Sequence, residues 1–181
     1  MDGVNTGPNG IEMKRTSARG GTVELGRLVF RTGLALSIRI RSMNWLFKEE
    51  PTHYSYDALV KDKKTTWSGV KNPLAQKHLR SVRKSDRIFY YHTGDERAVV
   101  GICKALGDSY PDPGDKSGKA AVVDVAPVSK LARPVTLAEI KADKAFADFA
   151  LVRISRLSVM PVTDAEWARI EAKAGKAGGA G

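Results

Sequence analysis

A tryptophan beside a flexible turn marks the stretch of sequence best suited to ligand chemistry, the segment WSGVKN at residues 67–72. Glycine lets the backbone adopt a positive φ or come close to a ligand. A tryptophan at such a turn can stack on a nucleobase, which is worth roughly 1–3 kcal/mol for any base. The segment also fits a core tryptophan that plugs one end of a barrel, with the glycine only making a turn. From this segment alone, both interpretations stand.

Two strand-like segments add polar candidates. In IFYYHT (residues 88–93), the strand period of two places Tyr90 and His92 on one face and Tyr91 on the other, so one tyrosine faces the core. A lone histidine at a strand end is more often a hydrogen-bonding residue than a catalyst. In WLFKEEP (residues 45–51), Lys48 and Glu50 share a face. They form either a solvated or ion-paired couple, or the lining of a polar pocket in which Glu50 accepts from a base amino group.

The charge of the chain points to a polyanionic partner. It has 30 Lys and Arg against 20 Asp and Glu, a formal net charge of +10 and a pI near 9.8. Such an excess attracts nucleic acids, although it also serves solubility alone. Part of it is concentrated just after the WSGVKN segment, in QKHLRSVRK. We predict that this part of the chain binds phosphates through Lys71, Lys77, Arg80, Arg83 and Lys84.

Motifs of catalytic and metal chemistry are missing from the sequence. It contains no G-x-S-x-G, Walker, H-E-x-x-H or zinc-deaminase pattern and no carboxylate pair at a fixed spacing. The single cysteine, Cys103, excludes an internal disulfide, and its apolar surroundings predict a small buried side chain. The three histidines have no metal-ligand spacing. We therefore predict no catalytic residue, metal or cofactor, and the sequence gives no argument for an enzyme.

The elements that must position these residues alternate irregularly between strands and helices. Strands are expected at 44–49, 87–93, 97–106 and 120–131, with one or two more in 150–162. Helices are expected after Ser55 and Asn72, and after the capping boxes that begin at Thr136 and Thr163. The helix after Asn72 would present one face made of Leu74, His78, Leu79 and Val82. Short strands with irregular helix insertions favour an α+β fold with a small curved sheet or barrel, and no glycine fingerprint supports a Rossmann fold.

The ends of the chain differ in composition from its middle. Residues 1–42 are rich in glycine and arginine without a sustained period, and we interpret them as a disordered or mis-called extension before a natural start at Met43. A transit peptide is the alternative. We expect a domain at 43–173 and a flexible tail at 174–181. No apolar run approaches the roughly 20 residues of a membrane helix, so we predict a soluble, cytoplasmic protein, monomeric and without a membrane partner.

Several linked motifs occur in an order that resembles the EVE domain of the thymocyte nuclear protein family and its bacterial relatives. They are WLFKEEPTHYSYDAL, TTWSGVKNPLAQKHLR, DRIFYYHTGDERAVVGICKAL, VVDVAPV and RLSVMPVTDAEW. The likeness covers about Asn44 to Lys173. It implies a PUA-like fold, a compact barrel of about five or six strands with helices inserted around it. It also implies a non-catalytic module that reads a flipped-out, modified base of DNA or RNA.

The resemblance also implies a base-binding pocket. Residue by residue, the matching positions are Lys48, Glu50, Trp67, Ser68, Gly69, Val70, Asn72, Tyr91, His92 and Asp124. The chain departs from the family pattern at Glu49, where serine is common, and at Lys71, where arginine is usual. Loss of the planar arginine fork makes bidentate contacts less favourable there. Ala120 replaces a common aromatic and would widen the pocket.

Three functions remain open at this point. The leading hypothesis is a reader of a modified base that grips phosphates with its basic helix. The first alternative is a base-modifying or hydrolytic enzyme that uses the same pocket. The second is a structural or adaptor barrel with no ligand, in which Trp67 and Tyr91 would be fully buried with no cavity beside them.

Overall fold

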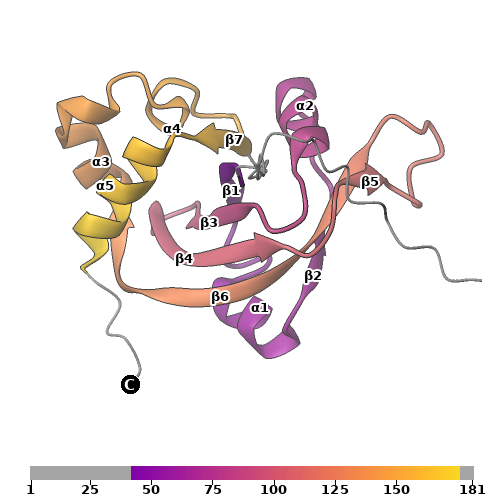
Figure 1. Ribbon diagram of the computed structural model, residues 1–181, viewed down its shortest axis with the longest axis horizontal. Coiled ribbons are helices and arrows are strands. Elements are labelled where there is room, and N and C mark those ends of the chain that lie inside the picture. The colour runs from indigo at the N-terminus through magenta and orange to yellow at the C-terminus, as the bar shows by residue number, and fades with distance from the viewer. Residues whose placement is uncertain (1–41, 176–181) are drawn as a thin grey trace, which may run out of the picture. The chain divides into compact units, whose positions relative to one another are not determined.

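A curved mixed sheet with helices around it is formed by residues 42–175, the part of the chain that the computed structural model describes (Figure 1). The sheet has seven strands in the order β2-β6-β4-β3-β1-β7, with β5 paired to β6. The strands are β1 (Asn44–Glu49), β2 (Thr65–Trp67), β3 (Arg87–His92), β4 (Ala98–Ala105), β5 (Tyr110–Pro111), β6 (Ala121–Thr136) and β7 (Val159–Val162). The predicted α+β fold with a small curved sheet is confirmed.

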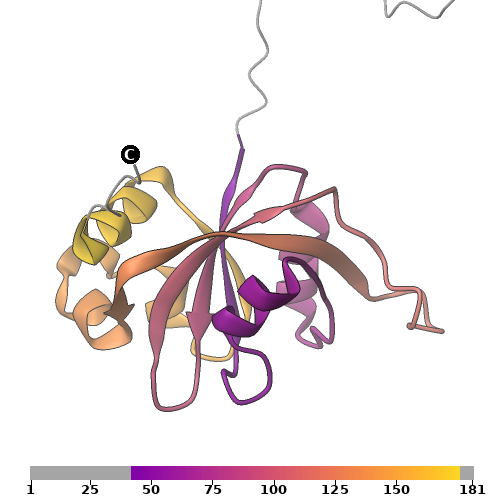
Figure 2. The same cartoon turned by 90° about the horizontal axis from the view of Figure 1, so that it is seen from below.

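The helices begin where the sequence supplies a capping side chain, with α4 as an exception. They are α1 (Tyr56–Asp62), α2 (Pro73–Ser81), α3 (Leu137–Ala142), the 3-10 helix η1 (Lys144–Phe146), α4 (Ala150–Arg153) and α5 (Asp164–Ala174). Both predicted capping boxes, at Thr136 and Thr163, are present. α3 and α5 lie at one end of β6, α2 lies toward its other end, and α1 lies against its middle, where Asp57 bonds to Lys130 (Figures 1 and 2). Within residues 42–175, no helix is long and apolar enough to span a membrane.

The parallel pair β1–β3 divides the core into two faces. Phe47 lies opposite Tyr90, and the next pair, Lys48 and Tyr91, points to the other side because side chains alternate along a strand. On the second side, Phe89 stacks on Trp167 of α5 with ring centroids 3.7 Å apart. The two faces of β1 and β3 therefore meet different parts of the chain.

Some local predictions are wrong. Of the predicted face after Asn72, Leu79 and Val82 are buried, but Leu74 is 41% exposed, and the helix buries Ala75 and Gln76 beside Leu79. The Gln76 amide explains part of this orientation, since it bonds to β6 and to the preceding loop. Within 150–162, one strand is present as predicted, β7, whereas the first residues form the unpredicted helix α4. β2 and β5 were missed, because strands of 3 and 2 residues are too short to show an alternating pattern.

The ends of the predicted domain fall close to the limits of the described chain. The predicted extension (1–42) and tail (174–181) lie outside the described residues, except for Ser42, Ala174 and Gly175. α5 continues to Ala174, one residue beyond the predicted domain end. Cys103 is buried as predicted, and its burial raises the pKa of the thiol well above its ordinary range.

Candidate functional site

The residues predicted to bind a base divide between two faces of the sheet. Trp67 contacts Phe47 and Tyr90, on the same face as His92. Lys48 and Tyr91 belong to the opposite face, where the Lys48 Nζ lies 5.9 Å from the centre of the Tyr91 ring. In residues 42–175, Trp67 and Tyr91 therefore face opposite sides of the central strands and do not line one pocket together.

The Trp67 side chain belongs mainly to the core. Only 6% of the residue is exposed. Its ring centroid lies 5.0 Å from that of Phe47 and 5.4 Å from that of Tyr90. Of the two interpretations of this tryptophan, the core position describes its packing, and the ring is not a free stacking wall in this conformation.

The loop after Trp67 is exposed and held at both ends. Gly69 has φ +73°, and a Cβ added there would meet nothing within 4 Å, so this glycine serves backbone conformation rather than close packing. The Gln76 side chain donates to the Val70 carbonyl at 2.8 Å and accepts from the Ala121 amide at 2.9 Å. Asn72 accepts from two amides at the start of α2, so its side-chain oxygen serves as the helix cap.

His92 and Glu50 are both engaged by neighbouring groups. His92 Nε2 accepts from the Tyr56 amide at 3.0 Å, which assigns the ring proton to Nδ1, 2.5 Å from Glu96 Oε2. Glu50 Oε2 accepts from the Thr93 hydroxyl at 2.6 Å. This network fixes the ends of β1 and β3, and His92 has the hydrogen-bonding role that a strand-end histidine usually has.

Asp124 and a tyrosine not predicted from sequence lie together on β6 and β5. Asp124 Oδ1 accepts from the Thr66 hydroxyl at 2.7 Å and from the Tyr110 hydroxyl at 3.0 Å. Tyr110 is 37% exposed, and it lines a shallow hollow of about 290 Å³ together with Arg80 and Arg83. An exposed aromatic beside basic side chains suits a base next to a phosphate. The short β5 gave no sequence signal for it.

The five predicted phosphate-binding residues differ in their freedom to contact a ligand. Arg80 donates to the Lys119 carbonyl, and Arg83 donates to two carbonyls of its own helix end. The side chains of Lys71, Lys77 and Lys84 are exposed and make no hydrogen bond or ion pair within residues 42–175. The three lysines are therefore the groups best placed to meet phosphates.

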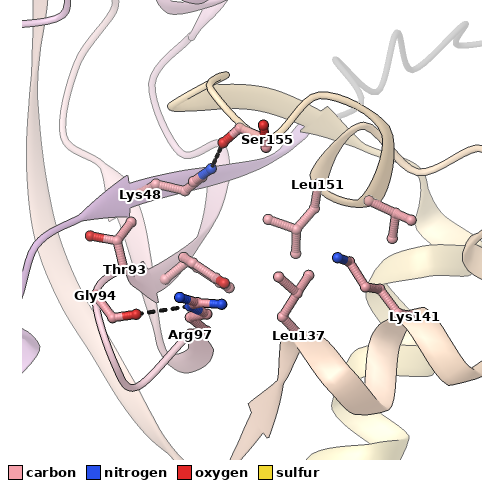
Figure 3. Close-up of a pocket in the computed structure, with 10 residues that line it drawn as sticks. Lys48, Thr93, Gly94, Arg97, Leu137, Lys141, Leu151 and Ser155 are labelled. Carbon is pink, nitrogen blue, oxygen red and sulfur yellow. Dashed lines mark hydrogen bonds between the residues drawn. The ribbon is translucent and has the colours of Figure 1, made fainter.

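A separate cavity of about 370 Å³ lies on the face of Lys48 and Tyr91 (Figure 3). The Lys48 amine donates to the Ser155 carbonyl at 2.6 Å, and burial lowers the pKa of Lys48. Burial raises the pKa of Tyr91 to about 12, an effect that the nearby Arg97 opposes. Arg97 and Lys141 also line this cavity, and neither was predicted. Both are isolated cations in the sequence, which gives no sign that the fold brings them together.

The curved mixed sheet with helices at both ends of β6 is the architecture of PUA-like domains. Within that class, residues 43–173 match the EVE domain, and the chain belongs to the EVE domain family, as its motifs indicated.

Relatives of known structure or name agree with this assignment. Human thymocyte nuclear protein 1 is 31% identical over 160 residues, which cover 70% of this chain and 71% of that protein. A protein of Rhodopseudomonas palustris solved by NMR is 42% identical, with a TM-score of 0.70 over 74% of this chain and 93% of that one. The human THYN1 protein in complex with 5-methylcytosine-containing DNA is 28% identical, with a TM-score of 0.67 over 75% of this chain and 99% of that one.

Proposed function

We propose that this chain binds DNA and recognises a modified base, with 5-methylcytosine as the first modification to test. The observation that carries the proposal is the similarity to the human relative whose structure was solved with 5-methylcytosine-containing DNA. The net charge of +10 supports it, because a basic protein is attracted to the phosphate backbone. RNA as a ligand, a cytoplasmic location and a monomeric state stay predictions from the sequence.

The proposed contact surface combines the loop after Trp67 with α2 and β5. Ser68 and Gly69 expose backbone groups that can bond to a base edge, and Tyr110 offers an exposed ring. Lysines on the loop and helix hold phosphates on either side. Phosphate contacts supply affinity, and base contacts supply selectivity.

A flipped-out base is part of the proposal for duplex DNA. A base within the stack hides its edge, and extruding it costs a few kcal/mol. The base would enter beside Ser68, with His92 and Asp124 on β3 and β6, Glu50 directly after β1, and Trp67 behind the loop. Lys48 and Tyr91 lie on the opposite face of β1 and β3, so we leave them out of this base site.

Fluorescence anisotropy with labelled duplexes tests the proposal. Duplexes of one sequence carry a single cytosine, 5-methylcytosine, 5-hydroxymethylcytosine or N6-methyladenine at the same position and are titrated at one fixed salt concentration. Tighter binding of one modified duplex is expected, and equal binding of all of them contradicts base recognition. No binding even at low salt contradicts DNA binding itself.

A pair of serine variants connects selectivity to the loop. Ser68→Ala removes an exposed hydroxyl that makes no hydrogen bond within residues 42–175, so the fold is unaffected. We expect a smaller preference for the modified duplex and unchanged binding of the unmodified one. Ser42→Ala makes the same change at another exposed serine and serves as the matched control.

A further inference from the structure

The cavity on the face of Lys48 and Tyr91 has the composition of an anion-binding site for an organic ligand. We propose that it binds the phosphate group of a nucleoside monophosphate, either free or at the 5′ end of a nucleic-acid strand. The cavity lies across β1 and β3 from Trp67, so it is a second site, distinct from the proposed base site. Its evidence comes from this chain's own side chains.

Cations reach the cavity from three elements. Lys48 extends from β1, Arg97 from the turn between β3 and β4, and Lys141 from α3, and Figure 3 shows them around one space. No carboxylate lines this cavity. Glu50 is bound to the Thr93 hydroxyl and Glu96 to His92. Asp95 and Glu96 line a neighbouring hollow that shares Arg97, Leu137 and Lys141 with the cavity. The three cations outnumber these two carboxylates, so the cavity keeps an excess of positive charge that an anion would neutralise.

Donors of all three cations are available to a ligand. Lys141 makes no hydrogen bond or ion pair with any described residue. Arg97 uses only its Nε, which donates to the Gly94 carbonyl at 3.0 Å, so both terminal nitrogens of the guanidinium are unused. Lys48 spends one ammonium proton on the Ser155 carbonyl. Arginine and lysine together match the oxygens of a phosphate, with the arginine fork giving a bidentate contact.

Tyr91 adds a hydrogen-bond donor to the cavity. The residue as a whole is 2% exposed, and its hydroxyl makes no hydrogen bond in the described part of the chain. Solvent still reaches this hydroxyl, because Trp167 Nε1 is the only fully enclosed side-chain nitrogen or oxygen without a partner in residues 42–175. Tyr91 lines the cavity, so its hydroxyl is free to donate to a ligand oxygen there.

The size and the apolar wall point to an organic ligand rather than a bare ion. The cavity of about 370 Å³ falls in the range of roughly 300–1,000 Å³ that small-molecule sites occupy. Leu137 and Leu151 point toward each other at its wall (Figure 3), and Tyr91 also lines the cavity. An aromatic and apolar wall next to cations suits a planar base joined to a phosphate. Burial lowers the pKa of Lys48, and a bound phosphate would favour its charged form again.

Isothermal titration calorimetry on the full chain tests the site with four small probes at matched ionic strength: deoxycytidine monophosphate, adenosine monophosphate, deoxycytidine and inorganic phosphate. Each monophosphate is expected to bind at least about tenfold more tightly than deoxycytidine or phosphate alone, since both halves of the ligand contribute. Equal binding of deoxycytidine and its monophosphate overturns the proposal. Binding of phosphate as tight as that of the monophosphates overturns the organic-ligand part.

Two oligonucleotide probes distinguish a free nucleotide from the 5′ end of a nucleic-acid strand as the ligand. A short oligonucleotide with a 5′-phosphate is compared with the same oligonucleotide ending in a 5′-hydroxyl. A preference for the phosphorylated end, together with competition by the free monophosphate, identifies strand ends as ligands. Binding of the free monophosphates without any such preference identifies a free nucleotide. If the free monophosphates do not bind and the 5′-phosphorylated strand is not preferred, the proposed site is contradicted.

Charge-neutralising variants locate the binding. Lys141→Gln and Arg97→Gln are each expected to weaken monophosphate binding by about tenfold or more, because each removes a cation that would contact the phosphate. Tyr91→Phe removes only a neutral donor and is expected to weaken binding less. Lys144→Gln is the matched control, an exposed lysine that does not line the cavity. Equal weakening by Lys141→Gln and Lys144→Gln means that only bulk charge matters and overturns the site. Arg97→Gln also removes a bond within the turn, whereas Lys141→Gln removes no hydrogen bond or ion pair within residues 42–175.

The two proposals fail independently. Lys141→Gln is expected to leave the preference for a modified duplex unchanged, and Ser68→Ala is expected to leave monophosphate binding unchanged. Loss of both activities in either variant contradicts the separation of the sites.

Discussion

The indole of Trp67 meets the ring of Tyr90 edge-on, with ring centroids 5.4 Å apart and an interplanar angle of 84°. Tyr90 belongs to the central strand β3, and its hydroxyl donates to the Tyr54 carbonyl at 2.7 Å. The residue that precedes the exposed loop is therefore anchored in the centre of the sheet. A ligand at Ser68 or Gly69 would therefore contact a loop whose start is held in place by the buried side chain of Trp67.

Trp67→Ala is expected to lower the free energy of unfolding by about 3–5 kcal/mol, because it removes a large buried side chain from the core. Urea denaturation followed by circular dichroism measures the change. Val128→Ala, at a residue that is 56% exposed, is the control and should stay within about 0.5 kcal/mol of the parent. A decrease below about 1 kcal/mol for Trp67→Ala would mean that the indole is not part of the core.

Gly101→Ala is expected to destabilise the fold by about 1–3 kcal/mol or more through overpacking. A Cβ at this position would lie 2.4 Å from two carbons of the Tyr56 ring, which is itself 1% exposed and unable to yield easily. Gly107→Ala is the matched control, since its Cβ would meet nothing within 4 Å. Similar urea midpoints for the two variants would show that Tyr56 moves aside without cost.

The lowered pKa of the Asp143 carboxyl predicts that the fold loses stability in acid. Hydrogen bonds from Arg169, the Ala145 amide and Lys173 lower its pKa to about 2. A carboxyl whose pKa is depressed on folding stabilises the fold above its unfolded pKa of about 3.9, and this contribution disappears as the pH falls through the folded value. Asp143→Asn should therefore show a smaller drop in melting temperature between pH 5 and pH 2 than the parent. An identical drop in both proteins would assign the acid sensitivity to other carboxyls.

The three free lysines predict the salt dependence of DNA binding. Replacing Lys71, Lys77 and Lys84 with glutamine should reduce the slope of log affinity against log salt by about one unit for each phosphate that the variant no longer neutralises. Replacing Lys61, Lys64 and Lys144 makes the same change in net charge elsewhere on the exposed surface and should alter the slope less. Equal slopes in the two triple variants would place the phosphates elsewhere.

The parts of the fold that the sequence predicts well are those encoded by local chemistry. Ser55, Asn72 and the capping boxes at Thr136 and Thr163 each fix a helix start, because a side-chain oxygen meets orphan amides within a few residues. The hairpin of β3 and β4 follows from alternation and a glycine-containing turn.

The candidate sites depend instead on contacts between distant segments. The resemblance to the family implies that Trp67 and Tyr91 line one base-binding pocket. The sequence motifs do not show that the two side chains lie on opposite faces of the strands. Arg97 and Lys141 meet only because α3 follows β6 back to the turn between β3 and β4. The buried amide of Gln76 was likewise unpredictable, since its partners at Val70 and Ala121 come from separate segments.

The position of β6 in the chain governs the order in which the domain can assemble. β6 pairs with β2, β4 and β5, all of which are synthesised before it. β1 gains its β7 partner later still, and the Asn44 side chain bonds to Asp164 across 120 positions of sequence. Pairings of such long range slow folding, because the loop must close before any contact stabilises it. On the ribosome, the side of β3 that carries Phe89 therefore stays uncovered until α5 emerges, because its stacking partner Trp167 belongs to that last helix, and exposed apolar surface of this kind makes a nascent chain prone to aggregation.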